Sequence, residues 1–196
     1  MDESEAIQRI RNGEISALEP LVRAHQLRAV RTAYLITRDR QIAEDIVQDA
    51  LIRAFERIGQ LRPGSPFAPW FLRIVVNDAL KAAQRGRRWV SLPDDASAHA
   101  VRWDAPGAAP DPEDILLENE MRSEVWIALG ALAPEQRTLL VLRYYVEWRE
   151  TELAEWLQTP VGTVKWRLHE ARRKLRMLLS ESRTCSTPEP SVRSRS

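Results

Sequence analysis

The residues of this chain that could do chemistry are mostly cations, and many of them lie on one side of an expected helix over 160–179. Val161, Val164 and Leu168 repeat there with the i, i+3/i+4 spacing of a packed helix face. Arginine and lysine neutralise phosphates and bind guanine edges, so the opposite face favours major-groove DNA binding over the alternative, a solvated basic surface. That face carries Thr163, Lys165, Trp166, Arg167, His169, Arg172 and Arg173.

A short helix expected over 149–157 precedes this basic helix, and the turn Gln158-Thr159-Pro160 separates the two. Thr159 is expected to cap the second helix, with Pro160 at its first position. Two helices joined by a three-residue turn form a helix-turn-helix candidate, whose second helix enters the major groove.

A second group of cations follows an expected helix that begins near 67–69 and carries Trp70, Phe71 and Asn77. Aromatic rings beside cations suit single-stranded nucleic acid, because bases stack on rings while cations hold the backbone. At helical spacing, however, such rings more often lie in a core, and we expect at least one of Trp70 and Phe71 there. The cations are Lys81, Arg85, Arg87 and Arg88, with no acid between them.

The clearest helix opens at Asp39 and runs to about Ile58, with a polar face that includes Asp45 and Asp49. Two carboxylates four residues apart share a face and could bind a metal or act as acid and base. No third ligand lies near them in the sequence, and the three histidines fall in separate segments. We therefore expect no metal, no cofactor, no small-molecule substrate and no enzymatic activity; the face is a solvated surface by default, or a partner-binding surface.

The whole sequence predicts an all-α protein of two small helical domains, the second containing the helix-turn-helix. Of its 196 residues 44% are hydrophobic, no segment alternates long enough for a strand, and no apolar run reaches the ~18 residues of a membrane span. The acidic start lacks a secretory signal, and one cysteine, Cys185, makes no internal disulfide, so we expect a cytoplasmic protein without membrane insertion. Seven tryptophans are an unusual feature.

Charge is balanced overall, with 29 basic and 28 acidic residues, but it is segregated along the chain. A stretch over 89–113, rich in proline and alanine, is acidic and reads as a flexible linker. We therefore predict a first domain over 1–88, the linker over 89–113, a second domain over 114–180 and a disordered tail over 181–196.

Several segments resemble bacterial extracytoplasmic-function (ECF) sigma factors, in the same order and with similar spacing. The segment 43–55 resembles their helix that binds core RNA polymerase, and 69–77 resembles the promoter-melting helix that follows. Three further segments, 132–137, 140–145 and 160–165, are similar to their C-terminal domain.

The resemblance implies a dissociable RNA polymerase subunit that directs the core enzyme to promoters. It implies that Asp45, Gln48, Asp49 and Arg53 face the β′ coiled coil. It places Trp70, Asn77, Lys81, Arg85, Arg87 and Arg88 near the −10 strand of promoter DNA. The second domain would hold the β flap and read the −35 element, and an anti-sigma factor, which could hold the protein at the membrane, would be a further partner.

At two positions of the expected recognition helix the chain departs from the family: Trp166 stands where a small residue is common, and Glu170 where arginine is frequent. The promoter sequence that the chain prefers therefore does not follow from the resemblance. We expect the acids Asp94, Asp95 and Asp104 of the linker to mimic nucleic acid. Two alternatives are a helix-turn-helix regulator with an unrelated effector domain and an adaptor that binds no DNA. The regulator leaves the helices around residues 45–53 and 70–77 unexplained.

Overall fold

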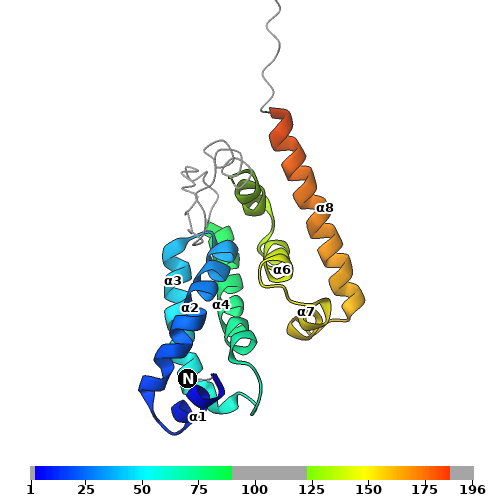
Figure 1. Cartoon of the computed structure of the whole chain (residues 1–196). Coiled ribbons are helices and arrows are strands. Elements are labelled where there is room, and N and C mark those ends of the chain that lie inside the picture. The colour runs from blue at the N-terminus through cyan, green and yellow to red at the C-terminus, as the bar shows by residue number, and fades with distance from the viewer. Residues whose placement is uncertain (1–2, 90–122, 186–196) are drawn as a thin grey trace, which may run out of the picture.

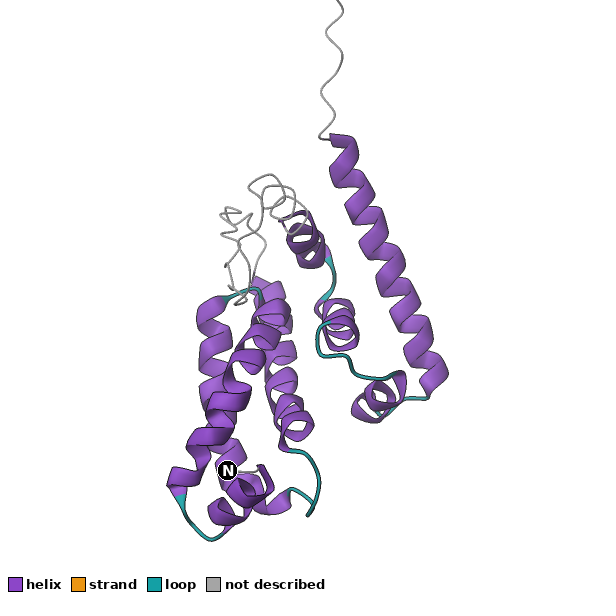
Figure 2. Cartoon of the chain, in the orientation of Figure 1, coloured by secondary structure: helices purple, strands orange, loops and turns teal. Residues whose placement is uncertain are grey.

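The computed structural model describes residues 3–89 and 123–185, and every regular element within these ranges is helical, as the sequence predicts (Figures 1 and 2). None of the helices described there is long and apolar enough to cross a membrane. The N-terminal elements are α1 (Glu3–Arg11), α2 (Leu18–Thr37), α3 (Arg40–Arg57) and α4 (Phe67–Trp89), with 3₁₀ turns at Ile15–Ala17 and Ile58–Gln60. The C-terminal elements are a helix over 123–131, α6 (Pro134–Tyr144), α7 (Glu150–Leu157) and α8 (Val161–Cys185).

The N-terminal bundle packs α2, α3 and α4 side by side, with α1 across one end (Figure 1). Alanines such as Ala33 and Ala50 are fully buried between the helices, and their small side chains allow a close approach of the axes. Phe67 and Phe71 are also fully buried, with ring centroids 5.3 Å apart. The prediction that Trp70 or Phe71 lies in the core is confirmed by Phe71.

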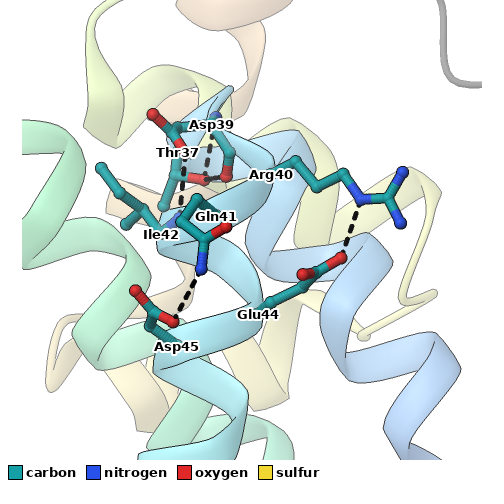
Figure 3. Close-up of polar contacts among 7 residues, drawn as sticks. All are labelled: Thr37, Asp39, Arg40, Gln41, Ile42, Glu44 and Asp45. Atoms are coloured by element: carbon teal, nitrogen blue, oxygen red, sulfur yellow. Dashed lines mark hydrogen bonds and ion pairs between the residues drawn. The ribbon is translucent and has the colours of Figure 1, made fainter.

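A tight turn at Arg38 and Asp39 separates α2 from α3 (Figure 3). Arg38 takes the left-handed conformation, with φ of 64°, and its N–H donates to the carbonyl of Tyr34, which ends α2. The Asp39 carboxylate then accepts a hydrogen bond of 2.9 Å from the Ile42 N–H. This is an N-cap, so the sequence-based start of the helix at Asp39 is confirmed.

The C-terminal bundle buries Leu142, Leu153 and Val164 completely, one from each of α6, α7 and α8. The helix-turn-helix is present, but the predicted cap at Thr159 is wrong. The Thr159 N–H donates to the carbonyl of Ala154, so Thr159 closes α7, and its buried hydroxyl has no hydrogen-bond partner among the described residues. Pro160 stands before α8 instead, and its carbonyl accepts from the Thr163 N–H at 2.9 Å.

The C-terminal helices extend over the following residues. The helix before α6 is described over 123–131, and the residues that precede it, like the linker acids and the end of the tail, lie outside the described residues. Helix α8 continues to Cys185, because no glycine or proline interrupts the segment after Leu179. The two bundles touch along α2 and α4 on one side and α6 on the other (Figure 1).

Candidate nucleic-acid interface

Helix α3 presents an open acidic face. Its other side is anchored by Ala43, Val47 and Ala50, which are at most 1% exposed. Asp45, Gln48 and Asp49 are exposed, as either a solvated surface or a partner-binding surface requires. Figure 3 shows the Gln41 amide donating to the Asp45 carboxylate at 3.2 Å, and Arg40 pairing with Glu44 at 2.7 Å.

Arg53 differs from the other three residues predicted to bind the polymerase core. Its guanidinium lies 2.6 Å from the carboxylate of Asp78 on α4, and the two side chains are 35% and 22% exposed. Its Nε also donates to the backbone carbonyl of Asp49. Arg53 therefore links α3 to α4. The exposed part of the acidic α3 face consists of Asp45, Gln48 and Asp49, which precede Arg53 by one to two helical turns.

Helix α4 carries the residues predicted to meet the −10 strand. Trp70, Asn77, Lys81 and Arg85 follow intervals of seven, four and four, which places them on one helix face. Trp70 is half-buried against Phe67, with centroids 5.8 Å apart, while the other three are exposed. Arg87 and Arg88 occupy the last turns of α4, and their side chains lie outside the described residues.

The structure shows contacts of this α4 face that sequence reasoning missed. The Asn77 side-chain oxygen accepts a hydrogen bond of 2.9 Å from the indole N–H of Trp156 on α7. Arg73, one turn before Asn77, pairs with Glu155 at 3.3 Å and lies over the ring of Trp148. The only sequence signal that could have pointed to these contacts is the high number of tryptophans.

Helix α8 is held to the bundle by Val164, Leu168 and Ala171, which are at most 2% exposed. Trp166 lies nearly opposite these residues around the helix and is 65% exposed, an unusual position for a large apolar ring. The other residues predicted to bind DNA surround it. Lys165, Arg167, His169 and Arg173 are exposed, while Thr163 and Arg172 are half-buried.

Several cations of this basic face make ion pairs or hydrogen bonds within the C-terminal bundle. Arg173 pairs with Glu170 at 2.8 Å, Lys165 lies 3.8 Å from Glu150, and the Arg172 guanidinium approaches the hydroxyl of Tyr144 at 3.5 Å. Glu170 thus faces a cation of its own helix, which offsets the repulsion that this carboxylate would exert on a DNA phosphate. No group of three or more metal-ligating side chains occurs within 3–89 and 123–185.

A helix-turn-helix formed by α7 and α8, with exposed cations on α4 and α8 and an exposed acidic face on α3, is typical of one class of protein: a two-domain helical DNA-binding protein. The comparisons with known proteins agree with this class. Residues 21–89 match the Sigma-70 region 2 family, and residues 123–175 match the Sigma-70 region 4 family.

The chain is 31% identical to the RNA polymerase sigma-H factor of Pseudomonas aeruginosa over 176 residues, which cover 87% of this chain and 90% of that protein. It is 30% identical to the ECF RNA polymerase sigma-E factor of Escherichia coli, over 85% of this chain and 88% of that protein. It is 33% identical to the ECF sigma factor SigE of Mycolicibacterium smegmatis, of which it spans 62%.

Among solved structures, the fold is similar to that of CnrH in complex with the cytosolic domain of CnrY, with a TM-score of 0.63 at 22% identity, over 91% of this chain and 97% of that one. The sigma factor RpoE in complex with the anti-sigma factor NepR from Bartonella quintana gives a TM-score of 0.54 at 22% identity, over 88% of this chain and 98% of that one. The chain belongs to the ECF sigma factors, which are transcription initiation factors that bind DNA.

Proposed function

We propose that this chain is the promoter-specificity subunit of an RNA polymerase, with three surfaces that act in sequence. The exposed part of the α3 face (Asp45, Gln48 and Asp49) docks on the β′ coiled coil. The α4 face captures unstacked bases of the −10 element, and α8 reads the −35 element while its domain holds the β flap. The observation that carries this proposal is that all three surfaces lie on elements matched to sigma regions 2 and 4.

The activity we propose is binding rather than catalysis. Cations at exposed positions of α4 and α8 supply phosphate contacts, and Asn77 and the ring of Trp70 supply contacts to unpaired bases. The described chain carries no membrane-spanning helix, and we propose a cytoplasmic location with an anti-sigma factor as a regulatory partner. The likeness to two solved complexes, one of them with an anti-sigma factor, supports this partner. We propose residues 1–88 and 114–180 as the two functional domains.

Asp49→Arg tests the docking surface. Asp49 is exposed and its side chain makes no hydrogen bond or ion pair with the described residues, so the fold should tolerate the change within about 0.5 kcal/mol. Reversal of a charge at an interface should weaken binding to core polymerase by at least about tenfold. The measurement is the affinity of the full chain for purified core enzyme by fluorescence anisotropy, followed by run-off transcription from a cognate promoter.

The matched control is Glu5→Arg, which makes the same charge change at an exposed position of α1, away from the proposed surface. This variant should bind core enzyme as the unmodified chain does. An Asp49→Arg variant with unchanged core affinity would refute the assignment of the α3 face. Tight binding to duplex promoter DNA without core would favour the helix-turn-helix regulator instead.

A further inference from the structure

Helix α4 starts between two prolines. The first four N–H groups of a helix have no partner inside it, and two of them are missing here because Pro66 and Pro69 carry no N–H. The N–H groups of Phe67 and Ala68 remain. Pro66, which stands directly before Phe67, has no side-chain oxygen that could accept either of them. The local sequence therefore leaves the start of α4 to be completed from elsewhere.

Glu3, at the first position of α1, completes it. The Glu3 carboxylate accepts a hydrogen bond of 2.6 Å from the Phe67 N–H, across a separation of 64 residues. A carboxylate at this place also faces the positive end of the helix dipole, and a hydrogen bond to a charged acceptor is stronger than one between neutral groups. Glu3 thus acts as the cap of a helix that lies far from it in the sequence.

The second oxygen of Glu3 lies beside a histidine that contacts the same phenylalanine. Glu3 Oε2 is 3.2 Å from Nε2 of His25 on α2, and the His25 side chain is 18% exposed. The rings of His25 and Phe67 have centroids 5.5 Å apart. Phe67 is therefore held through its backbone by Glu3 and through its ring by His25.

Phe67 in turn supports the aromatic ring that we propose meets unpaired bases. The ring centroids of Phe67 and Trp70 are 5.8 Å apart. Phe67 is fully buried, whereas Trp70 is half-buried and keeps part of its surface accessible. Because the two rings are in contact, a shift of Phe67 would move Trp70. The contacts thus run from Glu3 through Phe67 to Trp70.

Helix α1 also holds the segment that leads into α4. The guanidinium of Arg11, at the last position of α1, donates to the backbone carbonyl of Leu61, which is buried. Leu61 and Phe67 stand at the two ends of the connection between the 3₁₀ turn Ile58–Gln60 and α4. Helix α1 lies across this end of the bundle and binds the connection at both ends (Figure 1).

The attachment of α1 to the bundle does not depend on these polar contacts. Ala6, Ile7 and Ile10 are at most 8% exposed and belong to the hydrophobic core. Glu3 and Arg11 are the terminal residues of α1, about 12 Å apart along the helix axis. Replacement of Glu3 by alanine should therefore remove the cap of α4 and leave α1 in place.

We propose that Glu3 is a positioning residue for promoter melting. Through Phe67 it holds the start of α4, and with it the ring of Trp70, in the arrangement that captures bases of the −10 element. This inference rests on the proposed function of the α4 face. Glu3 itself contacts neither DNA nor polymerase, because both of its carboxylate oxygens are used inside the N-terminal bundle.

The expected effect is that of a lost helix cap. In Glu3→Ala, DNA binding has to restore an ordered start of α4 without the cap, so the affinity for the −10 strand should fall by about fivefold. Glu3→Gln keeps a side-chain oxygen that can accept the Phe67 N–H. This conservative variant should stay within about twofold of the unmodified chain.

The first experiment tests the contact in the free full-length chain. Hydrogen exchange at the Phe67 amide, followed by NMR, should be about fivefold faster in Glu3→Ala and close to normal in Glu3→Gln. The matched control is Glu5→Ala, which removes an exposed carboxylate from the same turn of α1 and should leave this exchange unchanged. Equal exchange at Phe67 in Glu3→Ala and the unmodified chain would overturn the proposal.

The second experiment measures DNA binding by the holoenzyme. Two DNAs from a cognate promoter are compared: a fork that exposes the −10 element as a single strand, and a duplex that contains the −35 element and ends before −10. Glu3→Ala should lower the affinity for the fork by about fivefold and leave the affinities for the duplex and for core enzyme unchanged. An equal loss of all three affinities would indicate a merely structural role, and that result or an unchanged fork affinity would refute the proposal.

A double variant tests whether Glu3 acts through Trp70. Trp70→Ala should itself weaken binding to the fork, and Glu3→Ala should then change the affinity by less than about twofold, because both variants affect the same contact with the bases. Fully additive losses would contradict this dependence. If the unmodified holoenzyme bound the fork no better than the duplex, the proposed function of the α4 face would fail, and the role of Glu3 in melting with it. Normal fork binding with unchanged exchange at Phe67 in Glu3→Ala would overturn the positioning role alone.

Discussion

The ion pair between Arg53 and Asp78 connects the α3 face to the α4 face, and Arg53→Met removes it. Methionine retains most of the aliphatic stem of arginine while deleting the charge and the donors. The substitution leaves the Asp78 carboxylate half-buried, and among the described residues its remaining cation is Lys81, at 4.0 Å. We therefore expect the N-terminal domain to lose stability.

The size of the loss follows from the exposure of the two groups. Fully exposed pairs contribute about 0.2–1 kcal/mol, and hydrogen bonds to charged groups about 1.5–3 kcal/mol. The Arg53 and Asp78 side chains, at 35% and 22% exposed and 2.6 Å apart, fall between these cases. We expect Arg53→Met to lower the free energy of unfolding by about 1–1.5 kcal/mol, with a coupling energy to Asp78→Asn of about 1 kcal/mol.

The assay is urea-induced unfolding of the full chain, followed by far-UV circular dichroism, for both single variants and the double variant. Arg57→Met, an exposed arginine one turn further along α3, is the matched control and should change the free energy of unfolding by less than about 0.5 kcal/mol. A coupling energy below about 0.3 kcal/mol would refute the reasoning, because additive effects indicate independent side chains. Arg53 would then be free to meet β′, as the resemblance to ECF sigma factors implies.

Three further predictions concern the cap, the core and the DNA contact. Asp39→Ala should lower the free energy of unfolding by about 1 kcal/mol while Asp39→Asn, which still caps, should be nearly neutral in the same urea assay. Phe71→Ala should cost about 3–5 kcal/mol because the side chain is fully buried, and a loss below about 1 kcal/mol would contradict its place in the core. Arg167→Ala should weaken the binding of holoenzyme to promoter DNA and should reduce the slope of the log binding constant against log salt concentration by about 0.9. Fluorescence anisotropy at several salt concentrations measures this slope, and an unchanged slope would exclude a phosphate contact.

The sequence was sufficient to predict the helices that carry the proposed surfaces. Apolar spacing along α3, α4 and α8, a capping aspartate at position 39 and the turn before Pro160 are local signals, and each acts within a few residues. The exposed positions of Asp45, Asp49 and Trp166 follow from the same periodicity, because a helix that buries one face must expose the other. The cap predicted at Thr159 is wrong. The Thr159 N–H donates to the carbonyl of Ala154, so this residue belongs to the end of α7 and does not cap α8.

Tertiary structure alone decided which polar groups meet. Trp156 and Asn77 are 79 residues apart, and Arg73 and Glu155 are 82 apart, so no local pattern relates them. The same holds for Arg53, whose partner Asp78 lies on another helix, and for Arg38 against Gly130. Periodicity fixes which face of a helix is apolar, whereas the partner of a polar side chain depends on how the helices pack. For that reason the sequence shows that this chain is rich in tryptophan, and only the packed structure shows that three of these residues join its two domains.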